Sequence, residues 1–200
     1  MSDGPAQAAC TAQDGRVMSE KKKILLHTCC APCAAGSYER LRELGYEITF
    51  LYSNSNIYPR AEHDIRLENI RKLADALGIE LLCDTYDHDS WLKRVQGLEN
   101  EPEKGGRCAV CFEVNLGRAA FFAERHGIEK FTTTLTVSPH KESQKIFDAG
   151  RRFPRYIEFD FKKKGGSARS SMLCREFGLY RQSYCGCEFS LRDMERRRNR

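Results

Sequence analysis

The 200-residue sequence has no run of about 18 apolar residues, the length that a transmembrane helix needs. Its first 22 residues lack the apolar segment of a secretory signal peptide. No glycine-rich loop of the kind that cradles phosphates follows the first predicted strand. These absences argue against a membrane-spanning chain, an exported protein and a phosphate loop at that position, and they predict a cytoplasmic protein. The ordinary share of hydrophobic residues, 40%, argues against a wholly disordered chain.

Cysteine, by contrast, is abundant, with 10 residues. Disulfides are disfavoured in a reducing compartment, so closely spaced cysteines predict metal binding or redox chemistry. The charge is also uneven, because residues 151–200 hold 14 Lys and Arg against 6 Asp and Glu, whereas the whole chain carries only +5. The cysteines and this basic segment are the features that a function has to explain.

Segments typical of strands and helices alternate from Lys23 onward. The alternation predicts an α/β fold, with a Rossmann-like, mostly parallel sheet and helices on both faces. Residues 1–22, with Cys10, are predicted to be a disordered tail, and residues 23–200 a single α/β catalytic domain with a basic C-terminal segment. Ser138 is predicted to cap one further helix. The predicted strands are 23–28, 46–52, 79–84, 130–136 and 156–161, and the predicted helices are 34–44, 60–77, 87–96, 108–126 and 165–179.

The first cysteine group, Cys29, Cys30 and Cys33, follows the first strand and opens a helix. Ligands bind beyond the carboxyl ends of parallel strands, and a helix N-terminus favours the thiolate that ligates metals. Two adjacent cysteines of a strand cannot both face the core, so a loop that turns both toward one metal explains them better. The alternative is a set of small buried hydrophobic residues.

The second group is the Cys108-x-x-Cys111 pair, which opens a helix and places both sulfurs on one face. Together with Cys29 and Cys30 it completes four thiolates, the number for a structural zinc or a [4Fe–4S] cluster. The thiolates alone do not choose between these two centres.

The third group is Cys185-Gly186-Cys187. A disulfide between residues at this spacing is strained, and strain suits a labile redox pair. The alternative is another pair of metal ligands. Cys83 and Cys174 are predicted to be core thiols without a role in the chemistry.

Lysine, arginine and tyrosine between Lys162 and Arg181 favour contact with an RNA strand, because cations meet phosphates and tyrosines stack on bases. Arg196–Arg200 are interpreted as part of a solvated tail. The predicted RNA-binding residues are Lys141, Lys162, Lys163, Lys164, Arg169 and Arg181.

Six motifs in order resemble the QueH-type epoxyqueuosine reductases, from about Lys23 to Cys187. They are HTCCAPC, NSNIYP, RCAVC, TTTLTVSPHK, DFKKKGGSARS and LYRQSYCGC, which begin at residues 27, 54, 107, 132, 160 and 179. The resemblance implies a fold related to the adenine nucleotide alpha hydrolases. It implies the last step of queuosine biosynthesis, a two-electron reduction of the epoxide of epoxyqueuosine at the wobble position of tRNA.

The resemblance also implies an iron–sulfur enzyme that needs no cobalamin and is served by an unidentified electron donor. A [4Fe–4S] cluster would be held by Cys29, Cys30, Cys108 and Cys111, and an additional iron beside it by Cys33. The redox-active disulfide would join Cys185 and Cys187.

A [4Fe–4S] centre normally passes one electron at a time, so the two-electron reduction needs a second redox partner. Two other classes of function stay open, a nucleotide-activating tRNA-modifying enzyme and a zinc-stabilised RNA-binding protein. Metal analysis separates the zinc protein from the iron–sulfur enzyme. Candidate proton donors for the reduction are His27, Tyr58, His140 and Tyr184.

Overall fold

The computed structural model describes residues 22–199. The predicted disordered tail, with Cys10, therefore lies outside the described residues, apart from Lys22, which is the first residue of β1. The core is a four-stranded sheet in the order β3-β2-β1-β4, and all neighbouring strands are parallel. The strands are β1 (Lys22–His27), β2 (Tyr46–Tyr52), β3 (Leu81–Cys83) and β4 (Lys130–Thr133).

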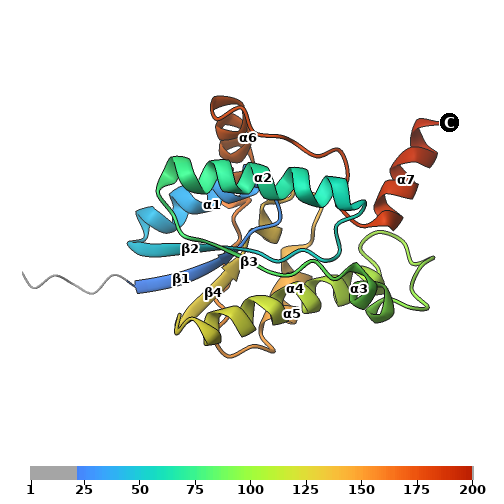
Figure 1. Cartoon of the computed structure of the whole chain (residues 1–200), viewed down its shortest axis with the longest axis horizontal. Helices are drawn as coiled ribbons and strands as arrows, with labels where there is room; N and C mark the ends of the chain where they lie inside the picture. The colour runs from blue at the N-terminus through green and yellow to red at the C-terminus, as the bar shows by residue number, and fades with distance from the viewer. Residues whose placement is uncertain (1–21, 200) are drawn as a thin grey trace, which may run out of the picture.

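Helices cover both faces of the sheet, so the predicted Rossmann-like α/β architecture is confirmed (Figure 1). The apolar residues of β1 alternate between the two layers, with Ile24 and Leu26 in one core and Leu25 in the other. One face carries α1 (Ala31–Glu43), α2 (Arg60–Leu77) and α6 (Gly166–Glu176), and the other carries α4 (Gly106–Arg125) and α5 (Ser143–Gly150).

Two further helices lie beside these layers. The helix α3 (His88–Arg94) packs through Trp91 against Phe189 of the C-terminal helix α7 (Glu188–Arg198). Figure 1 shows α7 at one end of the molecule, apart from the sheet. No helix within residues 22–199 is long and apolar enough to cross a membrane.

The predicted fifth strand, 156–161, is wrong. Tyr156 forms only an isolated parallel bridge with Phe131 of β4, supported by the hydrogen bond from Ile157 N to Phe131 O at 2.9 Å. Pairing stops there because β4 ends at Thr133 and the chain continues as a 3₁₀ helix, η1 (Thr134–Val137). A second 3₁₀ turn, η2 (Lys163–Gly165), precedes α6.

The strand predicted over 130–136 is therefore three residues too long. The hydroxyl of Thr133 accepts a hydrogen bond from Leu135 N at 3.2 Å and so caps η1 instead of continuing the strand. The predicted cap at Ser138 is also wrong, because α5 begins at Ser143 and Glu142 occupies its N-cap position. These changes of direction bring residues 134–141 to the carboxyl end of β4.

The strand order places a topological switch point between β1 and β4. From β1 the chain moves to β2 and β3 on one side of the sheet, whereas β4 pairs with β1 on the other. Loops that leave the two strands diverge at such a point and leave a crevice, which is where open α/β sheets bind ligands. Cys29 follows β1 and Thr134 follows β4, so the first cysteine group lies at this crevice.

Candidate functional site

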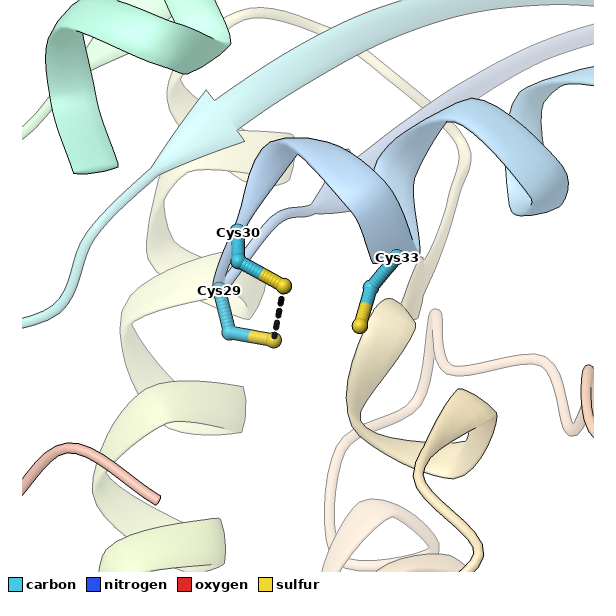
Figure 2. Close-up of side chains that lie close together, drawn as sticks. All are labelled: Cys29, Cys30 and Cys33. Atoms are coloured by element: carbon cyan, nitrogen blue, oxygen red, sulfur yellow. Dashed lines mark hydrogen bonds between the residues drawn. The ribbon is translucent and has the colours of Figure 1, made fainter. Parts of the chain in front are cut away.

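The first cysteine group brings three thiols to one point. The Sγ atoms of Cys29, Cys30 and Cys33 all lie within 4.8 Å of one another, and those of Cys29 and Cys30 are 4.0 Å apart. Cys30 is the N-cap of α1 and Cys33 lies in its first turn, where the helix dipole favours negative charge. Figure 2 shows the three sulfurs gathered below the start of α1. This group could hold a metal ion.

The three thiols share their protons unequally. Hydrogen bonding with Cys30 and Cys33 holds the pKa of the Cys29 thiol well below its ordinary value. The contact with Cys29 raises the pKa of Cys30 to about 12. The hydroxyl of Thr134 also donates to Cys29 Sγ at 3.3 Å and accepts from Cys29 N at 3.1 Å. These contacts favour the thiolate form of Cys29, the form that ligates metals.

Cys108 and Cys111 lie in the first turns of α4, as the spacing predicts. Cys108 Sγ accepts a hydrogen bond from Lys104 N at 3.2 Å, and Cys111 Sγ accepts one from the Asn115 amide at 3.5 Å. Burial raises the pKa of both thiols. A bound metal cation would displace these protons, so metal binding at Cys108 and Cys111 would be favoured by high pH.

A local contact explains Gly105, one of the two glycines before this pair. A Cβ atom at Gly105 would lie 2.5 Å from Glu101 Oε2 and 3.0 Å from Pro102 O. Gly106 N donates to the same carboxylate at 3.0 Å. Within the described residues, the close neighbour that requires Gly105 is therefore the preceding loop.

Cys185 and Cys187 flank Gly186 in the loop that leads into α7, and both are free thiols in this structure. Gly186 has φ of 143°, and its carbonyl accepts a hydrogen bond from Tyr58 N at 2.8 Å. A side chain at this position would lie 3.3 Å from both Arg66 and Ile57. A glycine is needed here because of both the positive φ and the close packing.

Arg66 of α2 binds the backbone of this loop, a role that no pattern in the sequence indicated. Its side chain is buried and paired with Glu62, at 2.7 Å from Nε to Oε1. Its Nη1 donates to Cys185 O at 3.2 Å and its Nη2 to Tyr184 O at 3.4 Å. An Arg four residues after a Glu is typical of a solvated helix pair, so only the tertiary structure reveals this role.

The three cysteine groups meet around two cavities that share part of their walls. Cys29, Cys185 and Lys141 line both cavities. The larger cavity has a volume of about 960 Å³, within the usual range for small-molecule sites of roughly 300–1,000 Å³. The smaller cavity is also lined by Cys108, Cys111 and Cys187, and the larger one by Cys30, Cys33, Tyr184 and Arg181.

The two remaining cysteines of the described residues differ. Cys174 is buried, as predicted, and its thiol donates to Leu179 O at 3.3 Å. Cys83 is exposed, so its prediction as a core thiol is wrong. It ends the short edge strand β3, where the chain leaves the sheet.

Lys141 brings a positive charge to the two cavities that the thiols line. Burial opposes this charge, but the sulfurs of Cys185 and Cys29, among others, raise the pKa of Lys141 above its ordinary value. Lys162, one of the predicted RNA-binding residues, donates to the carbonyl oxygen of Lys141 at 2.5 Å. It therefore steadies the Lys141 backbone.

The other predicted RNA-binding residues lie in different places. Lys163 and Lys164 are exposed on η2. Arg169 is paired with Glu39 of α1, at 2.6 Å from Nε to Oε2, and lines a separate groove beside α1 and α6. Arg181 lines the large cavity.

Two further cations line the large cavity, Arg197 and Arg198 of α7. Both belong to the segment that was interpreted as part of a solvated tail. Ser190 and Met194 of the same helix line it as well. These four residues recur at i, i+4, i+7 and i+8, which is the spacing of one helical face. This helical spacing is the signal in the sequence that could have shown these residues to share one face.

His27 is engaged in the fold and is not free to give a proton to the cavity. Its Nε2 lies 3.1 Å from Ser53 O, which can only accept, so Nε2 carries the proton. Its Nδ1 lies 2.9 Å from the hydroxyl of Thr133 and accepts from it. Burial lowers the pKa of His27, which favours this neutral form. His27 thus ties the end of β1 to β4 and to the chain after β2.

The other three candidate proton donors are placed differently. The hydroxyl of Tyr184 donates to Tyr58 O. Tyr58 is exposed and its ring stacks on His88. His140 is exposed and lines both cavities.

Comparison with known proteins agrees with this geometry. Residues 24–193 match the family model described as "Epoxyqueuosine reductase QueH". The chain is 38% identical over 180 residues to the epoxyqueuosine reductase QueH of Acinetobacter baylyi, covering 87% of this chain and 83% of the relative. It is 38% identical over 177 residues to that of Haemophilus influenzae, covering 86% and 72%. It is 35% identical over 174 residues to that of Dehalococcoides mccartyi, covering 84% and 92%. The chain therefore belongs to the epoxyqueuosine reductase QueH family.

Proposed function

We propose that this chain reduces the epoxide of epoxyqueuosine, at the wobble position of tRNA, to give queuosine. The observation that carries the proposal is the convergence of three cysteine groups, distant in the sequence, on two adjoining cavities at the carboxyl end of the sheet. The large cavity has room for a modified nucleobase. Family membership supplies the substrate class, as the relatives are named epoxyqueuosine reductases.

The proposed cofactor is a [4Fe–4S] cluster held by Cys29, Cys30, Cys108 and Cys111. The donor set fits, since four thiols from two segments are available and none is in a disulfide. Three of their sulfurs accept hydrogen bonds from Thr134, Lys104 and Asn115, and such bonds tune the potential of a cluster. When bound, the cluster supplies one-electron transfer.

Cys33 is the proposed ligand of an additional iron beside the cluster. Its closeness to Cys29 and Cys30 supports this choice, since a third thiol lies within 4.8 Å of two cluster ligands. No cobalamin is part of the proposal, as the resemblance to the QueH-type reductases implies.

Cys185 and Cys187 are the proposed redox pair. Removing the epoxide oxygen as water, with an alkene left behind, takes two electrons and two protons. Two thiols release both when they join in a disulfide, which an external electron donor must then reduce. Cys185 lines the large cavity as well as the smaller one, so it can lie near both the substrate and the other cysteines.

The remaining parts of the proposal concern the substrate and the compartment. Lys141 and Arg181 line the large cavity and are placed to meet an anionic strand. Lys163 and Lys164 are exposed on η2 and are proposed to contact the same strand. A tRNA substrate and a site built on free thiols both fit the reducing cytoplasm.

One experiment tests the proposal directly. The protein is purified without oxygen, its iron, sulfide and zinc are counted, and it is then incubated with epoxyqueuosine-containing tRNA and a chemical reductant. We expect at least four irons and four sulfides per chain and the appearance of queuosine. One zinc without sulfide would support the alternative, a zinc-stabilised RNA-binding protein, because three clustered thiols also suit zinc. Product that required ATP would support a nucleotide-activating enzyme.

A further inference from the structure

The helix α7 connects the redox loop to the rim of the large cavity. Cys187 is the N-cap of α7, and the last turn of the helix holds Arg196, Arg197 and Arg198. At a rise of about 1.5 Å per residue, Arg197 lies roughly 15 Å along the helix from Cys187. The N-terminus of α7 therefore lies at the Cys185–Cys187 loop, whereas its C-terminus is basic.

The cavity wall shows which arginines face inward. Arg197 and Arg198 line the cavity together with Met194, whereas Arg196 does not. Residues three and four apart share one face of a helix, and this places Arg196 on the other side.

Arg197 and Arg198 are also uncommitted. Both are exposed, and within residues 22–199 neither has an ion-pair or hydrogen-bond partner. Among residues 22–199, one carboxylate side chain lines the cavity, that of Glu103, whereas five cationic side chains do, those of Lys104, Lys141, Arg181, Arg197 and Arg198. The excess of positive charge at the mouth favours an anionic ligand.

We propose that Arg197 and Arg198 bind backbone phosphates of the RNA strand that flank the base held in the cavity. This inference rests on the proposed function, which makes tRNA the substrate. Arginine forks bind phosphate oxygens in a bidentate manner and stay charged at any working pH. The base and the phosphates are thus held by one helix face, next to the loop of Cys185 and Cys187.

The test compares two double variants of the cluster-loaded protein. Arg197→Ala/Arg198→Ala removes the two cations at the cavity mouth. Arg71→Ala/Arg196→Ala removes the same charge from exposed positions that do not line the cavity. Binding of an unmodified anticodon stem-loop RNA is measured at several salt concentrations, and binding of a guanosine mononucleotide is measured in parallel.

We expect the cavity variant to bind the stem-loop at least tenfold more weakly than the control variant, with a salt slope reduced by roughly 0.7 for each lost phosphate contact. Mononucleotide binding should be the same in both. Equal stem-loop binding by the two variants would overturn the proposal. A loss of mononucleotide binding in the cavity variant as large as its loss of stem-loop binding would overturn the assignment to a flanking strand.

This outcome is separable from that of the proposed function. If the wild-type protein binds the stem-loop but forms no queuosine from modified tRNA, the proposed reduction fails, while the comparison of the two variants still decides the role of Arg197 and Arg198.

Discussion

Arg66 is the clearest case of a side chain whose role depends on burial. Arg66 is 1% exposed, and its guanidinium forms an ion pair with the carboxylate of Glu62. Glu62 also accepts a hydrogen bond from the hydroxyl of Tyr180 at 2.8 Å. A buried ion pair contributes little net stability, but losing one partner leaves the other charged and unpaired. The pair therefore acts mainly to hold the carbonyl groups of Tyr184 and Cys185.

Replacing Arg66 by Met should reduce the free energy of unfolding by about 3–5 kcal/mol, because Glu62 would stay buried without its partner. Urea unfolding under anaerobic conditions measures this change. Arg71→Met, on an exposed position of the same helix, is the matched control and should change stability by less than about 0.5 kcal/mol. Equal free energies of unfolding for the two variants would contradict the assigned role of the buried Arg66–Glu62 pair.

Replacing either Cys185 or Cys187 by Ser should abolish turnover with a dithiol reductant while the iron content stays at the wild-type level. The reason is that neither residue is a proposed cluster ligand, and a single thiol cannot form the internal disulfide. Queuosine formation and iron analysis are measured on the same preparation. Cys83→Ser is the control, because Cys83 is exposed and lines neither site cavity. Full turnover of the variants would rule out the redox pair, and loss of iron would indicate ligands instead.

Ends of strands and helices decide where the chemistry-bearing side chains lie. The switch from β4 to η1 at Thr133 turns the chain toward the first cysteine group, so that the hydroxyl of Thr134 reaches Cys29. At the end of β3, Asp84 accepts hydrogen bonds from Arg118 of α4 at 2.6 and 2.7 Å. It also accepts one from Ser53 after β2 at 2.6 Å. These contacts tie the sheet edge to α4, which carries Cys108 and Cys111.

The Asp84 contacts predict a dependence of stability on pH. Burial by itself would raise the pKa of Asp84, but the hydrogen bonds from Arg118 and Ser53 hold it below its ordinary value. A lowered pKa stabilises the folded chain at pH values above the unfolded-state pKa of about 3.9, and this stabilisation is lost as the pH falls through the folded value.

Asp84→Asn should therefore unfold at lower urea concentration than the wild type at pH 7, and the difference should shrink below about pH 4. Urea titrations between pH 7 and pH 3 measure it. Asp75→Asn, on an exposed position of α2, is the control and should follow the wild type. A difference that stayed constant down to pH 3 would contradict the linkage.

The molecule as a whole is organised around the crevice between β1 and β4. Its two helical layers meet the sheet through separate cores, and both layers supply cysteines to the site, from α1 on one face and α4 on the other. A metal centre bound by both groups would therefore join the two layers. Such a centre stabilises the folded chain, because the unfolded chain does not preserve the site.

Removing iron with a chelator under anaerobic conditions should lower the melting temperature by roughly 10 °C, since a ligand at about 1,000 times its dissociation constant contributes about 4 kcal/mol and a chain of this size shifts by about 2–4 °C per kcal/mol. Differential scanning calorimetry before and after chelation measures this shift. Reconstitution with iron and sulfide should restore it. An unchanged melting temperature would indicate that the metal does not connect the two layers.

Local patterns in the sequence were sufficient for most helices and strands and for the grouping of the cysteines. Tyr46–Tyr52 and Arg60–Leu77 have the predicted bounds, because alternation of apolar residues and a terminal Gly78 are local features. The motifs at Cys29–Cys33 and Cys108–Cys111 likewise depend only on neighbours in the chain.

Only the tertiary structure decided which side chains meet. Arg66 reaches a loop more than a hundred residues away, Lys162 donates to the carbonyl of Lys141, and the exposed Arg197 and Arg198 line the large cavity. The failed fifth strand has the same origin, since a strand forms only where a neighbour offers a free edge, and β4 ends too early to offer one. A sequence determines by itself what a few successive residues do, whereas burial and long-range pairing depend on how the layers pack.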